Sequence, residues 1–281
     1  RTLPYVDAFA LGSLRYLIGI AVFVALLAAI EGRRALSYDG RFAHAAALGV
    51  VGITGFNLFV WIGLGFTLPE HASIILALQT PLIALGVWLT RGNRPPRFTL
   101  GCVAVAIAGV LIVVTKGEPA RAIADVAKGG ALLGDLLVLC GAIAWVAYTL
   151  SAARFPGWSP LRFTVLTCIP GAAGLLAAHA LAVAFGVVAL PSAAAVWDVG
   201  WQILYFSVGT VVLGVLAFNA ANRRLGPLNT MLMMNLVPIG VFAIEASLGR
   251  SFTAIEVGGA LVVVAALVAN NLYLRGTSAR R

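Results

Sequence analysis

Two otherwise apolar stretches of the chain each combine a proline with polar or soft side chains. The residues are Gln79, Thr80 and Pro81 in the first stretch, and Met234, Asn235 and Pro238 in the second. A proline inside a helix removes an N–H donor and frees the carbonyl four residues earlier. In lipid, such a carbonyl is tolerated only where neighbouring helices or a water-lined cavity satisfy it. The pattern therefore indicates a polar binding site between paired helix breaks, and a packed structural kink is the alternative interpretation.

Further polar and aromatic side chains reach similar depths in other apolar stretches. They are the pairs Asn57 with Trp61, Trp145 with Tyr148, and Phe206 with Thr210, each about one helical turn apart. Aromatic walls with a few polar groups suit a zwitterion that carries an apolar side chain. The methionines at 231, 233 and 234 add an adaptable surface. A single aromatic of this kind is more commonly a core or lipid-facing residue, so the hypothesis concerns the group.

Charged and titratable side chains also occur within or beside these stretches. Arg15 lies about eight residues inside an apolar stretch, where a charge must face protein or water. We weigh two roles for Arg15: structural pairing, for example with Asp7, and binding of a substrate carboxylate. His71, Asp135 and Glu245 lie nearer the ends of their stretches and are candidates either for proton relay or for simple interfacial caps.

The elements that must position these residues are membrane-spanning helices. The chain is 61% hydrophobic and 10% charged, far from the composition of soluble domains. Stretches of about 20 apolar residues, the length that crosses a bilayer, recur along it. We expect nine spans: 7–30, 43–66, 71–90, 98–115, 131–153, 160–188, 200–222, 227–248 and 252–274. The stretches lack the alternation of a membrane β-barrel, so the predicted fold is all-α.

The distribution of basic residues predicts the orientation. With strict alternation of the spans, 13 of the 19 lysines and arginines fall on the side of the loop that holds Arg33, Arg34 and Arg41. The positive-inside rule makes that side cytoplasmic, together with the C-terminus. We therefore expect a multi-pass membrane protein with a cytoplasmic C-terminus. The segment 116–130 lies on the opposite side and has the spacing of a short interfacial helix.

The sequence argues against an enzyme and against a nucleic-acid-binding protein. It contains no GxxxxGK[ST], HExxH or GxSxG motif, so we expect neither catalytic residues nor a cofactor. No cluster of metal ligands is evident. The net charge of +9 resides in short loops and forms no basic stripe with interleaved aromatics, so no nucleic-acid partner is expected.

An internal repeat is indicated by shifting the chain against itself by 157 residues. The shift superposes Pro81 on Pro238, Gly92 on Gly249, and Gly101 on Gly258 without a gap. We divide the chain into a first repeat (1–115), an external linker (116–130) and a second repeat (131–281). Five spans in the second repeat against four in the first lead us to expect one further helix before the first. An odd number of helices per repeat would place the two repeats in opposite orientations.

These motifs resemble the drug/metabolite transporter superfamily and, within it, the ten-helix EamA-type permeases. The matching segments are LGSLRYLIG around Arg15, the paired turns ending in Pro81 and Pro238, and GCVAVAIAGV with GGALVVVAAL near the ends of the repeats. Many family members carry a glutamate twelve residues after each helix proline. Asn93 and Arg250 occupy those positions here, so no role is carried over from that glutamate.

The resemblance implies a secondary transporter of a bacterial inner membrane that exports amino acids, aromatic and other apolar ones. We expect it to work by alternating access and as a monomer in the lipid bilayer. A permease for another metabolite, such as a sugar phosphate or nucleotide sugar, is the alternative. Such anions require clustered basic residues at mid-membrane depth, where the sequence offers Arg15.

Overall fold

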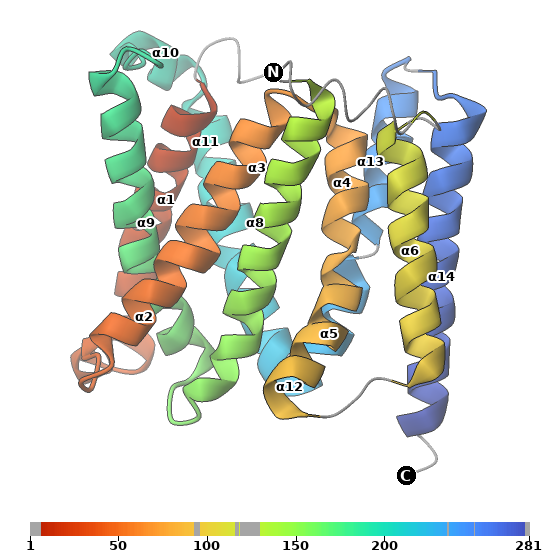
Figure 1. Cartoon of the computed structure of the whole chain (residues 1–281). Coiled ribbons are helices and arrows are strands. Elements are labelled where there is room, and N and C mark those ends of the chain that lie inside the picture. Colours follow the sequence, from red (N-terminus) through yellow and green to blue (C-terminus); the bar gives the residue numbers. More distant parts are fainter. Residues whose placement is uncertain are drawn as a thin grey trace. The chain divides into compact units, whose positions relative to one another are not determined.

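A computed structural model of the chain describes residues 7–92, 96–115, 118, 130–234, 236–249 and 251–278. All regular elements in these ranges are helices (Figure 1). Six helices are long and apolar enough to cross a membrane, and Arg97–Val113 and Ala254–Asn270 are shorter apolar helices. The all-helical, multi-pass prediction is confirmed for the described residues, whereas the nine spans and ten helices stay predictions. Most of the segment 116–130 lies outside the described residues, as does Asn235.

The chain forms two compact units whose residues alternate along the sequence. Unit 1 consists of Arg1–Trp61 and Ala147–Arg224, and unit 2 of Ile62–Val146 and Leu225–Arg281. These units are defined by contacts, whereas the ranges 1–115 and 131–281 were assigned from a sequence repeat. The division into repeats therefore stays a prediction.

Unit 1 combines long helices with shorter α, 3-10 and π elements. Its elements are α1 (Ala8–Ile30), η1 (Arg33–Leu36), α2 (Phe42–Gly49), η2 (Val50–Gly55), the start of α3 (Phe56–Leu64), the end of α8 (Ala131–Ser151), η3 (Ala152–Arg154), α9 (Pro160–Ala184), α10 (Ala193–Asp198), α11 (Gly200–Phe206), η4 (Ser207–Val215) and the start of α12 (Leu216–Met234). Helices α1 and α2 pack against α9 (Figure 1). Asp7 and Ser159 cap α1 and α9 by accepting backbone N–H bonds, which fixes where these helices begin.

Glycines allow α2 and α9 to approach closely. A Cβ atom on Gly49 would lie 2.1 Å from the carbonyl oxygen of Thr167, and one on Gly171 would lie 2.7 Å from the carbonyl oxygen of Gly49. Small residues at a helix crossing bring backbones together, and membrane helices gain van der Waals contact in this way. The crossing buries Ile53 and Leu166 completely.

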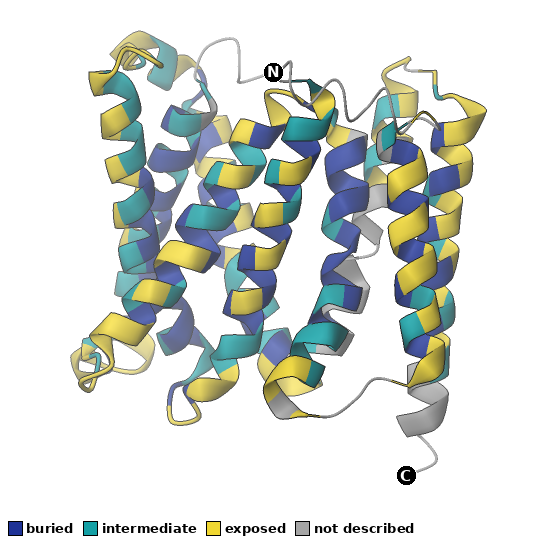
Figure 2. Ribbon diagram, in the orientation of Figure 1, coloured by how far each residue is buried: buried dark blue, intermediate teal, exposed yellow. Residues whose placement is uncertain are grey.

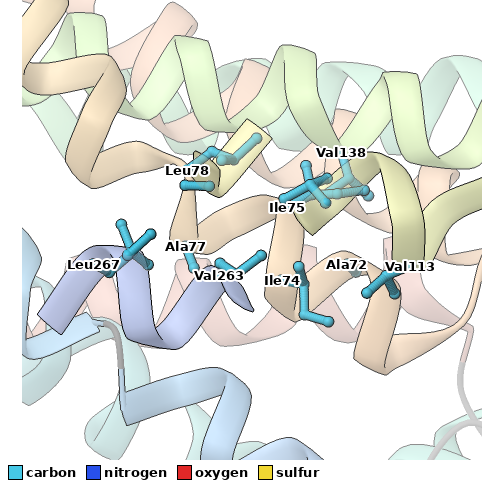
Figure 3. Packing of buried hydrophobic residues seen from close by; sticks show 12 residues of the cluster. Ala72, Ile74, Ile75, Ala77, Leu78, Val113, Val138, Val263 and Leu267 are labelled. Atoms are coloured by element: carbon cyan, nitrogen blue, oxygen red, sulfur yellow. The ribbon is translucent and has the colours of Figure 1, made fainter. Parts of the chain in front are cut away.

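Unit 2 has its own apolar core. Its elements are the end of α3, α4 (Pro69–Ala77), α5 (Gln79–Arg91), α6 (Arg97–Thr115), the start of α8, the end of α12, α13 (Leu236–Ser247) and α14 (Ala254–Ser278). Helices α6 and α14 lie side by side (Figure 1), with buried residues on their facing sides (Figure 2). Figure 3 shows the core cluster, in which Ile74, Ile75 and Leu78 pack with Val138 of α8 and with residues of α14.

The helix break at Pro81 occurs where the proline predicts it. Pro81 lacks the N–H that would bond to the carbonyl of Ala77, and α4 ends at Ala77. The next helix begins at Gln79. The break expected at Pro238 stays a prediction, because Asn235, between α12 and α13, lies outside the described residues. A second break follows from Gly226, whose φ of 80° ends one helical segment before Pro227 begins the next.

Element boundaries recur at the same spacing as the sequence repeat. Each of the following pairs of positions is 157 residues apart: the starts of the π-helical elements η2 and η4 at Val50 and Ser207, the left-handed Gly92 and Gly249, and the starts of α6 and α14 at Arg97 and Ala254. The two π-helical elements were not predicted from the sequence. Turns of π-helix within α-helices are rare and are frequent at functional sites.

Candidate functional site

The candidate site residues fall into both units. Unit 1 holds Arg15, Asn57, Trp61, Tyr148, Phe206 and Thr210, and unit 2 holds His71, Gln79, Thr80, Pro81, Trp145 and Glu245. The side chains of Met234 and Pro238, and the whole of Asn235, lie outside the described residues. Within each unit the structure shows which of these side chains meet.

Arg15 meets Asn57 and Trp61 in unit 1. Its Nη2 donates to Oδ1 of Asn57 at 2.6 Å, and its guanidinium lies 5.2 Å from the Trp61 ring centroid and 5.4 Å from that of Tyr16. Cation–π contacts of this kind stabilise a guanidinium that has left water. The predicted interaction with Asp7 is not the one formed, because Asp7 caps α1 by accepting from the N–H groups of Phe9 and Ala10.

Asn57 is the centre of this group, which we call the Arg15 cluster (Arg15, Tyr16, Asn57 and Trp61). Its Nδ2 donates to the Tyr16 hydroxyl at 3.1 Å and to the Ile53 carbonyl at 2.7 Å. Asn57 is 3% exposed, so all its hydrogen bonds are internal to the unit. Among the described residues no carboxylate lies within ion-pair distance of Arg15, and its Nε is buried without a hydrogen bond. The guanidinium of Arg15 is therefore stabilised by a neutral amide, which compensates only part of its charge.

Tyr148 belongs to a second polar network in unit 1. Its hydroxyl lies 3.1 Å from Oγ1 of Thr167 and accepts from Nδ2 of Asn219 at 3.0 Å. Asn219 also donates to Oγ1 of Thr164 at 2.8 Å. Oδ1 of Asn219 is buried, and the described residues give it no hydrogen-bond donor. The sequence analysis did not single out Asn219, although its position near the end of an apolar stretch is the kind of signal that identified Asn57.

Close packing sets the orientation of both aromatic side chains. A Cβ atom on Gly52 would lie 2.3 Å from Cβ of Tyr148, and one on Gly12 would lie 1.8 Å from the Trp61 ring. These two glycines therefore provide the space that the aromatic residues occupy. Neither ring can keep its present position if the glycine facing it gains a side chain.

Phe206 and Thr210 interact with each other by a local bond. Oγ1 of Thr210 donates to the Phe206 carbonyl at 2.6 Å, across the start of the π-helical element η4. Thr210 is exposed and Phe206 is half-buried. None of the hydrogen bonds formed by the described residues joins either side chain to the Arg15 cluster or to Tyr148.

In unit 2, the residues beside the α4–α5 break are buried. Gln79 is 3% exposed and Thr80 is 1% exposed, so polar groups do lie inside the unit at the break predicted by Pro81. Trp145 on α8 is 8% exposed. A buried amide and hydroxyl next to a broken helix fit both interpretations made from the sequence, a binding site and a satisfied kink.

His71 lies between two buried carboxylates of unit 2. Its Nδ1 is 3.7 Å from Oδ2 of Asp135 on α8, and its Nε2 is 3.9 Å from Oε1 of Glu256 on α14. Thr67 donates a short hydrogen bond to Oδ1 of Asp135. All three titratable residues are at most 4% exposed, and Glu245 is half-buried on α13. Among the described residues no group of three has the arrangement of a metal site.

Glu256 is a residue that the sequence analysis missed. It forms a capping box with Thr253: Oε2 of Glu256 accepts from the Thr253 N–H at 2.9 Å, and Oγ1 of Thr253 accepts from the Glu256 N–H at 3.2 Å. The pattern Thr253-x-x-Glu256 before an apolar run could have identified the start of α14. Its proximity to His71 could not be seen, because the two residues are far apart in the sequence.

The comparisons with known proteins establish the class of protein. The model of the EamA-like transporter family matches residues 132–272. The chain belongs to this family. Membership was predicted from the paired proline turns and the glycine-rich segments, and this part of the prediction is confirmed.

Relatives within this class cover nearly the whole chain. The uncharacterized transporter YrdR of Bacillus subtilis is 29% identical over 278 residues, which are 98% of this chain and 86% of YrdR. The uncharacterized transporter YyaM of the same organism is 28% identical over 94% of this chain and 84% of YyaM. The chain also matches a solved crystal structure of a protein, with a TM-score of 0.68 and 18% sequence identity. The match covers 98% of this chain and 91% of the chain in that crystal structure. That likeness concerns the fold alone.

Proposed function

We propose that this EamA-family transporter exports amino acids, aromatic and other apolar ones, across a bacterial inner membrane. Arg15 binds the substrate carboxylate, and Trp61 lies against the apolar side chain. The paired motifs resemble those of the aromatic amino acid exporter YddG of the same superfamily, and this resemblance is the source of the proposed substrate class.

The observation that carries the proposal is the state of the Arg15 guanidinium. It is held between two aromatic rings, hydrogen-bonded to the Asn57 amide, and has no carboxylate partner among the described residues. An arginine inside a membrane span is costly unless it is paired, so its retention indicates a function. A carboxylate ligand would supply the missing anion, and guanidinium binds carboxylates through two parallel hydrogen bonds.

The wider site of the proposal comprises the remaining candidates. These are Gln79, Thr80, Trp145, Tyr148, Phe206, Thr210, Met234 and Asn235, with Pro81 and Pro238 at the helix breaks. Support comes from the burial of Gln79 and Thr80 beside the break at Pro81. Polar groups beside a broken helix suit a substrate that crosses a membrane.

The transport cycle that we propose is alternating access by two inverted repeats, with the C-terminus in the cytoplasm and the monomer as the functional unit. The recurrence of helix boundaries at a spacing of 157 residues supports a duplicated plan. We propose uncoupled transport driven by the substrate gradient. His71 and Glu245 are then structural, and a proton-coupled cycle would assign them a relay role.

Counterflow in proteoliposomes tests the proposal with the full chain. Vesicles loaded with unlabelled phenylalanine are assayed for uptake of labelled phenylalanine, with and without a pH gradient, for the wild type, Arg15→Gln and Trp145→Ala. Loss of a charge-assisted hydrogen bond costs about 1.5–3 kcal/mol, which corresponds to a roughly 10- to 150-fold rise in KM for Arg15→Gln. Arg34→Gln on η1 is the matched control, because it removes an exposed arginine.

The outcomes separate the alternatives. Phenylalanine counterflow that is insensitive to pH, weakened by both site variants and unchanged in Arg34→Gln supports the proposal. Absence of counterflow for every amino acid, together with counterflow of a sugar phosphate, would replace it with the metabolite-permease alternative. Dependence on the pH gradient that disappears in His71→Gln or Glu245→Gln would replace uncoupled transport with proton coupling.

A further inference from the structure

A hollow beside the N-terminal end of α2 has a basic rim and apolar walls. Its volume is about 390 Å³, and it is lined by Arg41, His44, Ala47 and Leu48 of the α2 region and by Arg154 and Phe155. All six residues belong to unit 1. We call it the α2 hollow, and neither the transport proposal nor the sequence analysis uses it.

In the part of the chain that the structure describes, the basic groups of the hollow have no acidic partner. Arg41 is oriented by a long hydrogen bond from Nη1 to the Arg154 carbonyl, 3.5 Å, and by the Phe155 ring, whose centroid lies 5.9 Å from its guanidinium. No carboxylate lines the hollow. Among the described residues neither Arg41 nor Arg154 forms an ion pair.

The nearest acidic residue in the sequence, Asp39, is bound elsewhere. Its Oδ2 accepts from Nη2 of Arg162 at 2.6 Å, and hydrogen bonding with Ser37 together with Arg162 lowers the pKa of the Asp39 carboxyl. The Asp39 carboxylate therefore stays charged and directed to Arg162. Two arginines of the hollow remain available for an anion from outside the chain.

Apolar residues lie on the same face of the helix as the basic residues of the hollow. Arg41, His44, Leu48 and Val51 follow one another at intervals of three and four residues, which places them on one side of α2 and η2. Val51 is 44% exposed. At about 1.5 Å of rise per residue, the distance from Arg41 to Val51 is about 15 Å, which is half the thickness of a hydrocarbon core.

We propose that the α2 hollow binds one anionic phospholipid, with its phosphate at Arg41, His44 and Arg154 and its acyl chains along Leu48 and Val51. A phosphodiester supplies the negative charge that the hollow lacks, and guanidinium groups bind phosphate oxygens with two parallel hydrogen bonds. The match between the apolar stripe and one leaflet favours a lipid over a free phosphate ion. The predicted cytoplasmic location of Arg41 and Arg154 is the side on which anionic lipids attract basic residues.

Lipid retention by the purified full chain tests this proposal without any transport measurement. The protein in detergent is incubated with equimolar phosphatidylglycerol and phosphatidylethanolamine, and bound lipid is counted by native mass spectrometry. The test variant is Arg41→Gln/Arg154→Gln. The matched control is Arg33→Gln/Arg34→Gln, which removes the same charge from exposed residues of η1 outside the hollow. His44→Gln provides a milder second variant if the double variant fails to fold.

The expected result is at least fivefold preference for phosphatidylglycerol in the wild type. This preference falls by five- to tenfold in Arg41→Gln/Arg154→Gln, by two- to threefold in His44→Gln, and by less than twofold in the control pair. Equal losses in the test and control pairs would overturn the proposal in favour of general surface charge. Displacement of the lipid by millimolar inorganic phosphate or glycerol phosphate would overturn it in favour of a soluble-anion site.

Discussion

Arg15 on α1 and Asn57 on α3 are joined by a hydrogen bond of 2.6 Å between Nη2 and Oδ1. The bond connects a charged group with a neutral one inside unit 1. It keeps the guanidinium in place while leaving its charge without a counterion among the described residues. Replacing the Asn57 amide by a carboxylate would therefore change the net charge of the Arg15 cluster with little change in its shape.

Asn57→Asp should abolish substrate binding by Arg15 while the protein remains folded. The new carboxylate has nearly the shape of the amide and would pair with the guanidinium at the same position, so it competes with a substrate carboxylate. It can accept from the Tyr16 hydroxyl but no longer donates to the Ile53 carbonyl, and the ion pair with Arg15 offsets that loss. We expect KM for phenylalanine counterflow to rise at least tenfold. Asn57→Ala is the contrasting variant: it loses the hydrogen bonds to Arg15, Tyr16 and Ile53, and with them about 2 kcal/mol of stability, yet leaves the guanidinium free.

The two variants are therefore expected to change different measured quantities, KM and the free energy of unfolding. Asn57→Asp changes KM more than the free energy of unfolding, and Asn57→Ala does the reverse. Wild-type kinetics in Asn57→Asp would show that Arg15 does not bind the substrate carboxylate.

Tyr148→Phe should lower stability by about 1 kcal/mol. The substitution removes a hydroxyl that contacts Thr167 and Asn219, while Thr167 keeps its bond to the Phe163 carbonyl and Asn219 keeps its bond to Thr164. Unfolding by denaturant in detergent micelles measures the change. Tyr205→Phe is the control, because Tyr205 is 64% exposed and its loss should change stability by less than 0.5 kcal/mol. Equal effects of the two variants would refute a structural role for the Tyr148 network.

The sequence predicted those features that depend on local chemistry. The break before Gln79 follows from the missing N–H group of Pro81, and a proline acts on its own helix whatever surrounds it. The contact of Arg15 with other protein groups was predictable in the same way, because an isolated charge in an apolar stretch must face protein or water. Family membership followed from the order of these local motifs along the chain.

The features that the sequence did not predict depend on contacts between distant segments. The partner of Arg15 is an amide 42 residues away on another helix, and the expected partner Asp7 is engaged by the helix that it caps. His71, Asp135 and Glu256 come from three helices, and their convergence is a tertiary property. The π-helical elements at Val50 and Ser207 have no established signature in a single sequence, so they were not predicted.

His71→Gln should destabilise unit 2 by about 3 kcal/mol. The substitution removes the imidazole that lies between the buried carboxylates of Asp135 and Glu256, and loss of one member of a buried charged group is strongly destabilising. The hydrogen bonds from Thr67 to Asp135 and from Thr253 to Glu256 remain. The double variant His71→Gln/Glu256→Gln should recover part of this loss, because one of the two carboxylates is then neutral. A double-mutant cycle on thermal unfolding in detergent measures the coupling. Additive effects in the cycle would mean that His71 and Glu256 do not interact.

Gly49→Ala should be among the most destabilising of small substitutions in unit 1. The added Cβ would lie 2.1 Å from the Thr167 carbonyl oxygen, an atom of the α9 backbone that cannot rotate away, so α2 and α9 must separate. Overpacking of this kind costs typically about 1–3 kcal/mol.

Gly101→Ala on α6 is the control, because it makes the same chemical change where a Cβ meets nothing within 4 Å. Alanine is the better helix former by about 1 kcal/mol, so this control should leave the protein as stable or stabilise it. Thermal unfolding in detergent compares the two variants directly. If Gly49→Ala were as stable as Gly101→Ala, the close approach of α2 and α9 could not be the contact that holds unit 1 together.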